Sequence, residues 1–288
     1  MSSETLHTLQ EALTITPLTG GHEAEVLNFL SRRPVITSFM SGLIYDNGLE
    51  SPMNRGSFYS CRDHNQQLVG VALFGHFTLA ETTSQAARAA FASYARNLSA
   101  PRAITGEYLE LEDFWQLYAA GSNPPHLRRS DLILVQRSPA SDSHQPVKGL
   151  RQATLKELPL IVSVNAAMHF EQNGIDPLVC DPDGFRRRCA IRIEQGRKWV
   201  VTEGDQLVFK ADIVAETPQV IHIEGVYVNP DYRGRGMGRR CLSQLGRTLL
   251  TRTEALCLMV SEQNVQAQSF YRRAGYELHS RYGAIYPH

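Results

Sequence analysis

The segment Val226-Tyr227-Val228-Asn229-Pro230-Asp231-Tyr232-Arg233-Gly234-Arg235-Gly236-Met237-Gly238 decides the fold of this chain. An apolar, β-rich run ends at Pro230, and a turn of alternating arginine and glycine follows it. Helical periodicity then begins at Met237. A strand, a glycine turn and a helix in this order present several backbone N–H groups to an anion at the start of the helix. The sequence therefore predicts a phosphate-binding turn at residues 233–238.

Glycine has two uses in such a turn. It leaves the backbone open to a phosphate, and it adopts φ > 0 without the steric penalty that other residues meet. The pattern differs from the GxxxxGK[ST] phosphate loop, because no Lys-Ser or Lys-Thr follows the glycines. It also differs from GxGxxG, since Gly234, Gly236 and Gly238 stand at alternate positions. Neither of these two nucleotide-binding motifs is predicted here.

Arg233, Gly236 and Gly238 fit the pattern R/Q-x-x-G-x-G/A, which resembles the acyl-CoA-binding signature of the GCN5-related N-acetyltransferase (GNAT) superfamily. The segment 264–276, NVQAQSFYRRAGY, is similar to a second part of that family's pattern. The two signatures come in the family's order, with a helix and a strand predicted between them. The resemblance covers residues 150–288 and is to the FR47-like acetyltransferase domains in particular.

Composition excludes several classes of protein. The chain has 288 residues, 42% of them hydrophobic and 20% charged, which suits a soluble protein of two globular domains. Its 29 basic and 29 acidic side chains balance, and this argues against nucleic acid or an anionic membrane as a partner. Because no apolar run approaches the length of a transmembrane helix, no membrane span is predicted.

The five cysteines show neither a zinc-binding nor a disulfide spacing. We therefore predict no metal site and a reducing, cytoplasmic setting. The N-terminal residues lack the charged and apolar regions of a signal peptide, which agrees with that setting.

A stretch rich in proline and serine at residues 138–148 is predicted to be a linker. It would separate an N-terminal α/β domain at 1–137 from an acetyltransferase domain at 149–288.

The second half of the chain alternates helical and β-rich runs. The expected elements are a strand at 149–153, helices at 154–169 and 181–195, a hairpin of 198–203 and 207–215, a strand at 219–228, a helix at 237–252, a strand at 255–261, a helix at 265–274 and a final strand pair at 276–286. Thr154 and Glu157 have the spacing of a capping box. Pattern alone predicts an α+β fold with a mixed sheet. The resemblance implies the GNAT fold, a mixed, mostly antiparallel sheet flanked by helices.

The first half repeats part of this order. It contains a predicted hairpin of 58–61 and 68–74, a strand near Thr78 and a helix at 84–96, and residues 110–118 and 131–136 would be its last helix and strand. The segment Glu81–Gln85, which corresponds to the phosphate turn, contains no glycine. We predict a degenerate GNAT-like domain that has lost acyl-CoA binding; the alternative is an unrelated α/β domain.

The resemblance implies that acetyl-CoA is the acyl donor. The turn would bind its pyrophosphate through backbone N–H groups at the helix start, and arginines could add charge-assisted contacts. In the family the preceding strand pairs with pantetheine, and an asparagine contacts the CoA arm. The residues assigned to the cofactor are Val226, Tyr227, Val228, Arg233, Gly234, Arg235, Gly236, Met237, Gly238, Arg239 and Asn264. For Val226 and Val228 the alternative is a place in the sheet core, and Asn264 is also a favourable helix cap.

Acyl transfer to an amine needs a base for the amine and an acid for the departing thiolate. His222 and Glu224 precede the turn and, two residues apart on one strand, share a face of the sheet. One of them is the expected base, although either could be a solvent-facing strand residue. Tyr271 matches the tyrosine that faces the CoA sulfur in the family and is the expected acid; the alternative is an aromatic residue packed beside Phe270.

The expected function is transfer of an acetyl group from acetyl-CoA to a primary amine. Direct attack in a ternary complex is favoured, because no activated nucleophile stands out in the sequence. The acceptor would be a small-molecule or peptide amine. The oligomeric state stays open. The alternatives are a CoA-binding or protein-interaction module without turnover, and an acyltransferase that uses longer acyl groups.

Overall fold

The computed structural model describes residues 13–121, 124–140 and 146–288. The chain divides into two compact units, one of residues 1–130 with 281–288 and the other of residues 131–280. These units are not two consecutive segments, because the C-terminal residues belong to the first unit. Residues 141–145 of the predicted linker lie outside the described residues, and the domain boundaries at 137 and 149 stay a prediction.

The second unit is built on a mixed sheet of six strands in the order β6-β11-β10-β9-β8-β7. The strands are β6 (Leu127–Gln136), β7 (Arg151–Gln152), β8 (Lys198–Glu203), β9 (Gln206–Glu216), β10 (Val220–Val228) and β11 (Ala255–Ser261). Neighbouring strands are antiparallel, except that β10 and β11 are parallel. The mixed, mostly antiparallel sheet expected from the sequence is confirmed.

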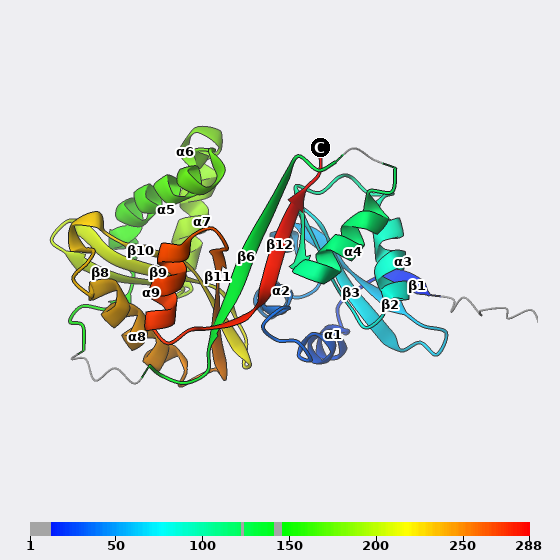
Figure 1. Ribbon diagram of the computed structural model, residues 1–288, viewed down its shortest axis with the longest axis horizontal. Helices are drawn as coiled ribbons and strands as arrows, with labels where there is room; N and C mark the ends of the chain where they lie inside the picture. The colour runs from blue at the N-terminus through cyan, green and yellow to red at the C-terminus, as the bar shows by residue number, and fades with distance from the viewer. Residues whose placement is uncertain (1–12, 122–123, 141–145) are drawn as a thin grey trace, which may run out of the picture. The chain divides into compact units, whose positions relative to one another are not determined.

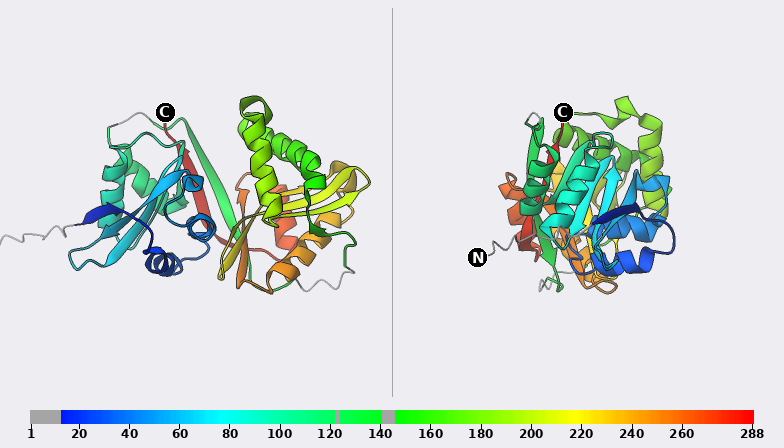
Figure 2. Two further views of the ribbon diagram at one scale, coloured as in Figure 1. Left: turned by 180° about the vertical axis from the view of Figure 1, so that it is seen from behind. Right: turned by 90° about the vertical axis from the view of Figure 1, so that its right-hand side faces the viewer.

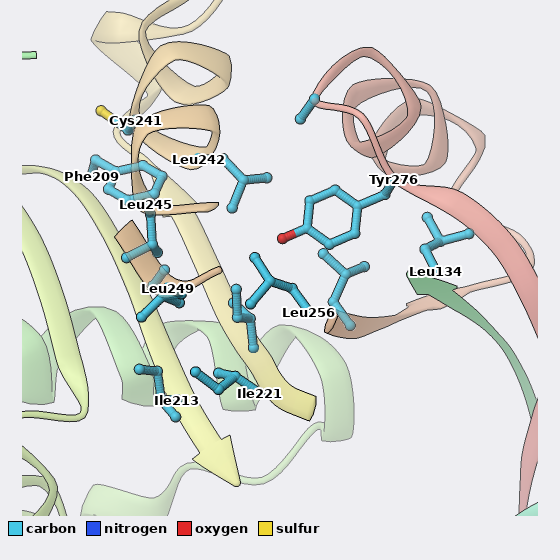
Figure 3. Packing of buried hydrophobic residues seen from close by; sticks show 14 of the residues in the cluster. Leu134, Phe209, Ile213, Ile221, Cys241, Leu242, Leu245, Leu249, Leu256 and Tyr276 are labelled. Atoms are coloured by element: carbon cyan, nitrogen blue, oxygen red, sulfur yellow. The ribbon is translucent and has the colours of Figure 1, made fainter. Parts of the chain in front are cut away.

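Helices cover both faces of this sheet (Figures 1 and 2). They are α5 (Leu158–Asn173), α6 (Pro177–Cys180), α7 (Pro182–Glu194), α8 (Met237–Leu249) and α9 (Val265–Arg273). A core that includes Ile161 of α5 and Ile193 of α7 lies on one face. On the other face, α8 buries Leu242, Leu245 and Leu249, whose spacing places them on one side of a helix. Figure 3 shows these leucines packed with the ring of Tyr276 and with side chains of the sheet.

The local signals of the sequence explain where these helices begin and end. Thr154 and Glu157 form the predicted capping box, although it opens a short 3₁₀ turn before α5. The α5 helix runs to Asn173, four residues beyond the predicted end at 169, and stops at Gly174 with φ 67°. Asp181 caps α7 through the Gly184 N–H. In the part of the chain that the structure describes, no helix is long and apolar enough to cross a membrane.

The first unit repeats this architecture. Its sheet has the order β1-β2-β3-β4-β5-β12, and β4 and β5 form the parallel pair. Its strands are β1 (Thr14–Pro17), β2 (Gly56–Arg62), β3 (Leu68–Gly75), β4 (Phe77–Thr82), β5 (Ala103–Glu107) and β12 (Glu277–Tyr286), and its helices are α1 (Glu23–Leu30), α2 (Ser38–Asn47), α3 (Gln85–Ala95) and α4 (Tyr108–Tyr118). One core packs under α1 and α2 and a second under α3 and α4. The first half therefore repeats the fold of the second half, as the predicted copy requires. The loss of acyl-CoA binding from this half stays a prediction.

The final strand of each unit comes from the other half of the chain. Residues 282–285 of β12 pair with β5 of the first unit, and residues 131–136 of β6 pair with β11 of the second. Packing shows the same exchange, since Ile285 is buried in the core under α3 and α4, whereas Leu132 and Leu134 are buried in the core under α8 and α9. The expectation that residues 131–136 complete the first half was wrong. So was the strand pair at 276–286, which is the single strand β12.

Candidate functional site

The predicted phosphate turn lies between β10 and α8. A short 3₁₀ turn, Pro230–Tyr232, follows β10, and Gly234 and Gly236 then adopt φ values of 74° and 73°. Gly236 is the N-cap residue of α8, and its carbonyl accepts the first helical hydrogen bond, from the Arg240 N–H at 3.1 Å. The N–H groups of a helix's first turn have no intrahelical acceptors. The α8 start can therefore offer them to an anion, with the favourable end of the helix dipole behind them.

The three glycines of the turn are needed for two different reasons. A Cβ atom on Gly234 or Gly236 would meet nothing within 4 Å, so these positions require glycine for the left-handed backbone and leave open space before the turn. A Cβ on Gly238 would lie 2.6 Å from Val228 Cγ2 and 3.3 Å from the Phe270 ring. Gly238 therefore lets the α8 start approach β10 and α9 closely.

The parallel pairing of β10 with β11 ends before the turn. Their parallel pairing joins Val220–Ile223 to Ala255–Leu258, but β10 continues to Val228 and β11 to Ser261. On its other side β10 remains paired with β9, through Tyr227 and Val228. The edge of residues 226–228 that faces β11 thus lies beyond the ladder, at the place expected for an extended pantetheine arm.

A β-bulge marks the point of separation. Glu224 pairs with Asp212 and Tyr227 with Lys210, so two residues of β10 stand opposite one residue of β9. Gly225, the first of the two, has φ 58°.

A buried ionic cluster lies against this bulge. The Lys198 and Lys210 ammonium groups donate to the same Asp212 Oδ2 atom, at 2.5 and 2.8 Å, and Lys210 also donates to the Gly225 carbonyl at 2.8 Å. The side chains of Lys198, Lys210 and Asp212 are 9%, 1% and 8% exposed. Sequence reasoning missed this cluster, yet charged residues at 210 and 212 within the apolar run 207–215 were a signal that could have found it.

The two base candidates lie in different surroundings. His222 is buried, and its burial lowers the pKa of the imidazole to about 4, so it is neutral at pH 7. Glu224 exposes more of its surface to solvent. The protein atoms around its carboxylate nevertheless raise its pKa, as does the charge of Asp212, while Lys198 and Lys210 oppose the increase. Glu224 is thus a carboxylate that is open to water but held in an environment that makes it more basic.

The α9 helix supplies the remaining predicted residues. The Asn264 side chain caps it by accepting from the Ala267 N–H at 3.0 Å, as the sequence indicated. Tyr271 is half-buried, and its ring contacts those of Phe270 and Tyr276, at centroid distances of 5.2 and 6.2 Å. Burial raises the pKa of Tyr271 to about 12, so its phenol keeps its proton at neutral pH.

The arginines of the turn differ in their exposure. Arg233 is exposed, and its Nε donates to the Val228 carbonyl at 3.0 Å, which ties the turn to the end of β10. Arg235 is exposed and Arg239 is half-buried in the first turn of α8. Among residues 13–121, 124–140 and 146–288, no group of three or more His, Cys, Asp or Glu side chains could hold a metal ion.

The first unit has different chemistry at the corresponding place. There the Ser84 hydroxyl caps α3 by accepting from the Ala87 N–H at 3.2 Å, in place of an open glycine turn. Beside it, Arg33 pairs with Glu81, Glu107 and Glu110, which line a pocket between β4, β5 and α4. Burial raises the pKa of Glu81 to about 7, although Arg33 opposes the increase. The start of α3 thus has a side-chain cap and a cluster of paired carboxylates nearby, whereas the start of α8 has an uncapped glycine turn.

Comparison with known proteins agrees with this geometry. Residues 194–278, which include the turn, the bulge and α9, match the family described as the acetyltransferase (GNAT) domain. The second unit contains a GNAT acetyltransferase domain. A segment of 84 residues is 32% identical to the peptidyl-lysine N-acetyltransferase YjaB of Salmonella typhimurium. This match covers 29% of this chain and 52% of that protein. The chain therefore matches about half the length of this curated relative. The FR47-like subgroup stays a prediction.

Solved structures extend the likeness to both units. A Drosophila protein aligns over 95% of this chain and 98% of its own, with a TM-score of 0.67 and 10% identity. A tandem GNAT protein from the clavulanic acid biosynthesis pathway aligns over the same shares, with a TM-score of 0.61 and 12% identity. At these identities the likeness shows the fold alone, and in both alignments it extends over the two units.

Proposed function

We propose that this protein transfers an acetyl group from acetyl-CoA to a primary amine, at a single site in the second unit. The observation that carries the proposal is the uncapped glycine turn at the start of α8, next to the point where β10 and β11 separate. This combination offers N–H groups for the pyrophosphate and a free strand edge for the pantetheine arm. The three glycines and Met237 form the phosphate-binding backbone, with Arg233, Arg235 and Arg239 as its nearby cations.

Direct transfer requires no covalent enzyme intermediate. The neutral amine attacks the thioester carbonyl, so a C–N bond forms and the C–S bond breaks, and the amine proton passes to a base. Glu224 suits this role better than His222, because it is open to water and its pKa is raised, whereas His222 is buried. Tyr271 would return a proton to the departing thiolate, since its phenol is protonated at neutral pH.

The acceptor is proposed to be a small-molecule or peptide amine. A peptide lysine is the first to test, because the matched relative is named as a peptidyl-lysine N-acetyltransferase. Neither nucleic acid nor a membrane is proposed as a partner, and a cytoplasmic setting follows from the cysteine pattern of the sequence.

The experiment measures CoA thiol release from acetyl-CoA with a panel of lysine peptides, polyamines and amino acids, with mass spectrometry of the product. Gly236→Asp would place a carboxylate before the turn and should abolish both CoA binding and turnover. Gly149→Asp is the matched control, because Gly149 also has positive φ (86°) and open space but lies outside the turn. Equal loss in both variants, or two CoA equivalents per wild-type chain in calorimetry, would contradict the proposal.

The alternative functions give different results in the same assay. A binding module without turnover would bind CoA and lose that binding in Gly236→Asp, but would release no thiol with any amine. An enzyme for longer acyl groups would show its largest kcat/KM with a donor longer than acetyl-CoA.

A further inference from the structure

Lys210 is an unusual residue to find at the centre of a sheet. Its side chain is 1% exposed. Apart from Asp212, the other residues of the strand segment 207–215 are apolar. A buried ammonium is costly unless it is paired and hydrogen-bonded, and an apolar side chain of similar volume often serves packing at least as well. Stability of the core therefore gives little reason for a lysine at this position.

The acceptors of Lys210 show what it holds in place. One is Asp212 Oδ2 on its own strand, and the other is the Gly225 carbonyl at the β10 bulge, both at 2.8 Å. The fit is close, because a Cβ on Gly225 would lie 2.8 Å from Lys210 Nζ and 3.0 Å from Asp212 Oδ2. Lys210 thus fixes a carbonyl that belongs to the irregular part of β10.

Lys198 provides the contrast within the same cluster. It comes from β8 and donates to the same Asp212 oxygen at 2.5 Å, but the Gly225 carbonyl is bound by Lys210. Asp212 pairs with Lys198 on one side and with Glu224 on the other. The two lysines are therefore alike in charge and in their shared carboxylate, and differ in the bond to the bulge.

We propose that Lys210 is a positioning residue for acyl transfer, which fixes the Gly225 carbonyl and so aims the following segment, residues 226–228, along the bound acyl-CoA arm. The proposal rests on the function proposed above. Lys198 helps to hold Asp212 but does not position the bulge.

Both lysines also act on Glu224 through space. The charged groups that affect the Glu224 carboxylate are Asp212, Lys198, Lys210 and, from α7, Arg192. Since both lysines lower the pKa of Glu224, removing either charge should move the acidic limb of the kcat/KM profile to higher pH. This electrostatic effect is common to the two positions, whereas the positioning effect belongs to Lys210.

The test compares Lys210→Met with Lys198→Met. Both variants should shift the acidic limb upward. In Lys210→Met alone, the pH-independent kcat/KM for acetyl-CoA should fall by about 10²-fold, the order expected when a reacting group is misplaced. Equal plateaus in the two variants, or a plateau in Lys210→Met that matches the wild type, would overturn the inference.

Hydrogen exchange supplies a second readout that needs no acceptor. Amides of residues 225–228 should exchange faster in Lys210→Met than in Lys198→Met, and equal rates would count against the inference. If Lys210→Met does not fold, Gly225→Ala disturbs the same bulge, because the added methyl group displaces Nζ and strains the positive φ of residue 225, and it should lower the plateau in the same way. Calorimetry of the wild-type protein tests the proposed function separately from the role of Lys210. Absence of CoA binding would refute the proposed function, and the hydrogen-exchange comparison would still decide whether Lys210 fixes the bulge.

Discussion

Replacing Ile285 by alanine removes three carbon atoms from the core of the first unit, although Ile285 is near the C-terminus. Ile285 is 1% exposed and packs in the core under α3 and α4. At about 0.8 kcal/mol for each buried CH₂ group, the lost transfer free energy is roughly 2.4 kcal/mol. The cavity left behind raises the expected loss in the free energy of unfolding above this value, to at most about 5 kcal/mol.

The assay is hydrogen exchange read element by element, because a chain of two units need not unfold in one step. A loss of about 2.4 kcal/mol corresponds to roughly 50-fold faster exchange, and we expect it at amides of β5 and α4. Amides of β11 should keep their wild-type protection. Leu278→Ala is the control on the same strand, because Leu278 is 56% exposed and its truncation should change little. Faster amide exchange in β11, with unchanged amide exchange in β5, would refute the assignment of β12 to the first unit.

Three further predictions concern chemistry and pH. Tyr271→Phe keeps the ring and should lower kcat by about 10²–10⁴-fold with little change in CoA affinity; an unchanged kcat, measured where chemistry limits the rate, would remove Tyr271 from the mechanism. Because a base works only when deprotonated, kcat/KM should fall as pH drops through the raised pKa of Glu224. Glu224→Gln should flatten this acidic limb and His222→Phe should retain it; the reverse pattern would make His222 the base. The hydrogen bond from Arg151 lowers the pKa of Glu157 from 4.5 to about 2. The ionised Glu157 side chain therefore stabilises the folded state fully above pH 4.5, and this stabilisation is lost as pH falls toward 2. Thermal unfolding of Glu157→Gln should lack that part of the acid dependence, and an identical dependence would contradict it.

The elements that the sequence predicted best are those controlled by local rules. The capping box of Thr154 and Glu157, the glycine turn before α8 and the asparagine cap of α9 are all present. Each depends on residues within a few positions of one another, so the pattern contains the whole interaction. The α8 helix was predicted equally well, because its apolar residues recur at helical spacing.

Other features were beyond such reasoning. The α5 helix continues past 169 because Gly174 rather than a nearer residue ends it, and α6 is a short turn after Asp176. The exposure of His222 and Glu224 could not be ranked from their shared strand, since it depends on which other elements cover each residue. Their alternation predicts a common face but says nothing about what packs on that face.

The sequence by itself determined that this chain has a strand, a glycine turn and a helix able to bind an anion, within an α+β fold. It predicted a related copy in the first half but left an unrelated domain open. Only the tertiary structure decided that β6 completes the sheet of the second unit and β12 that of the first. It also decided that Lys198, Lys210 and Asp212 meet at the β10 bulge. The physical reason is the same in both cases. Both depend on which strands pair: β6 and β11 are far apart in the chain, and the ionic cluster forms only where β8, β9 and β10 lie side by side. The apolar residues 132–135 of β6 would fit the edge of either sheet. The partner of β6 is selected by packing of the completed cores, which no local pattern contains.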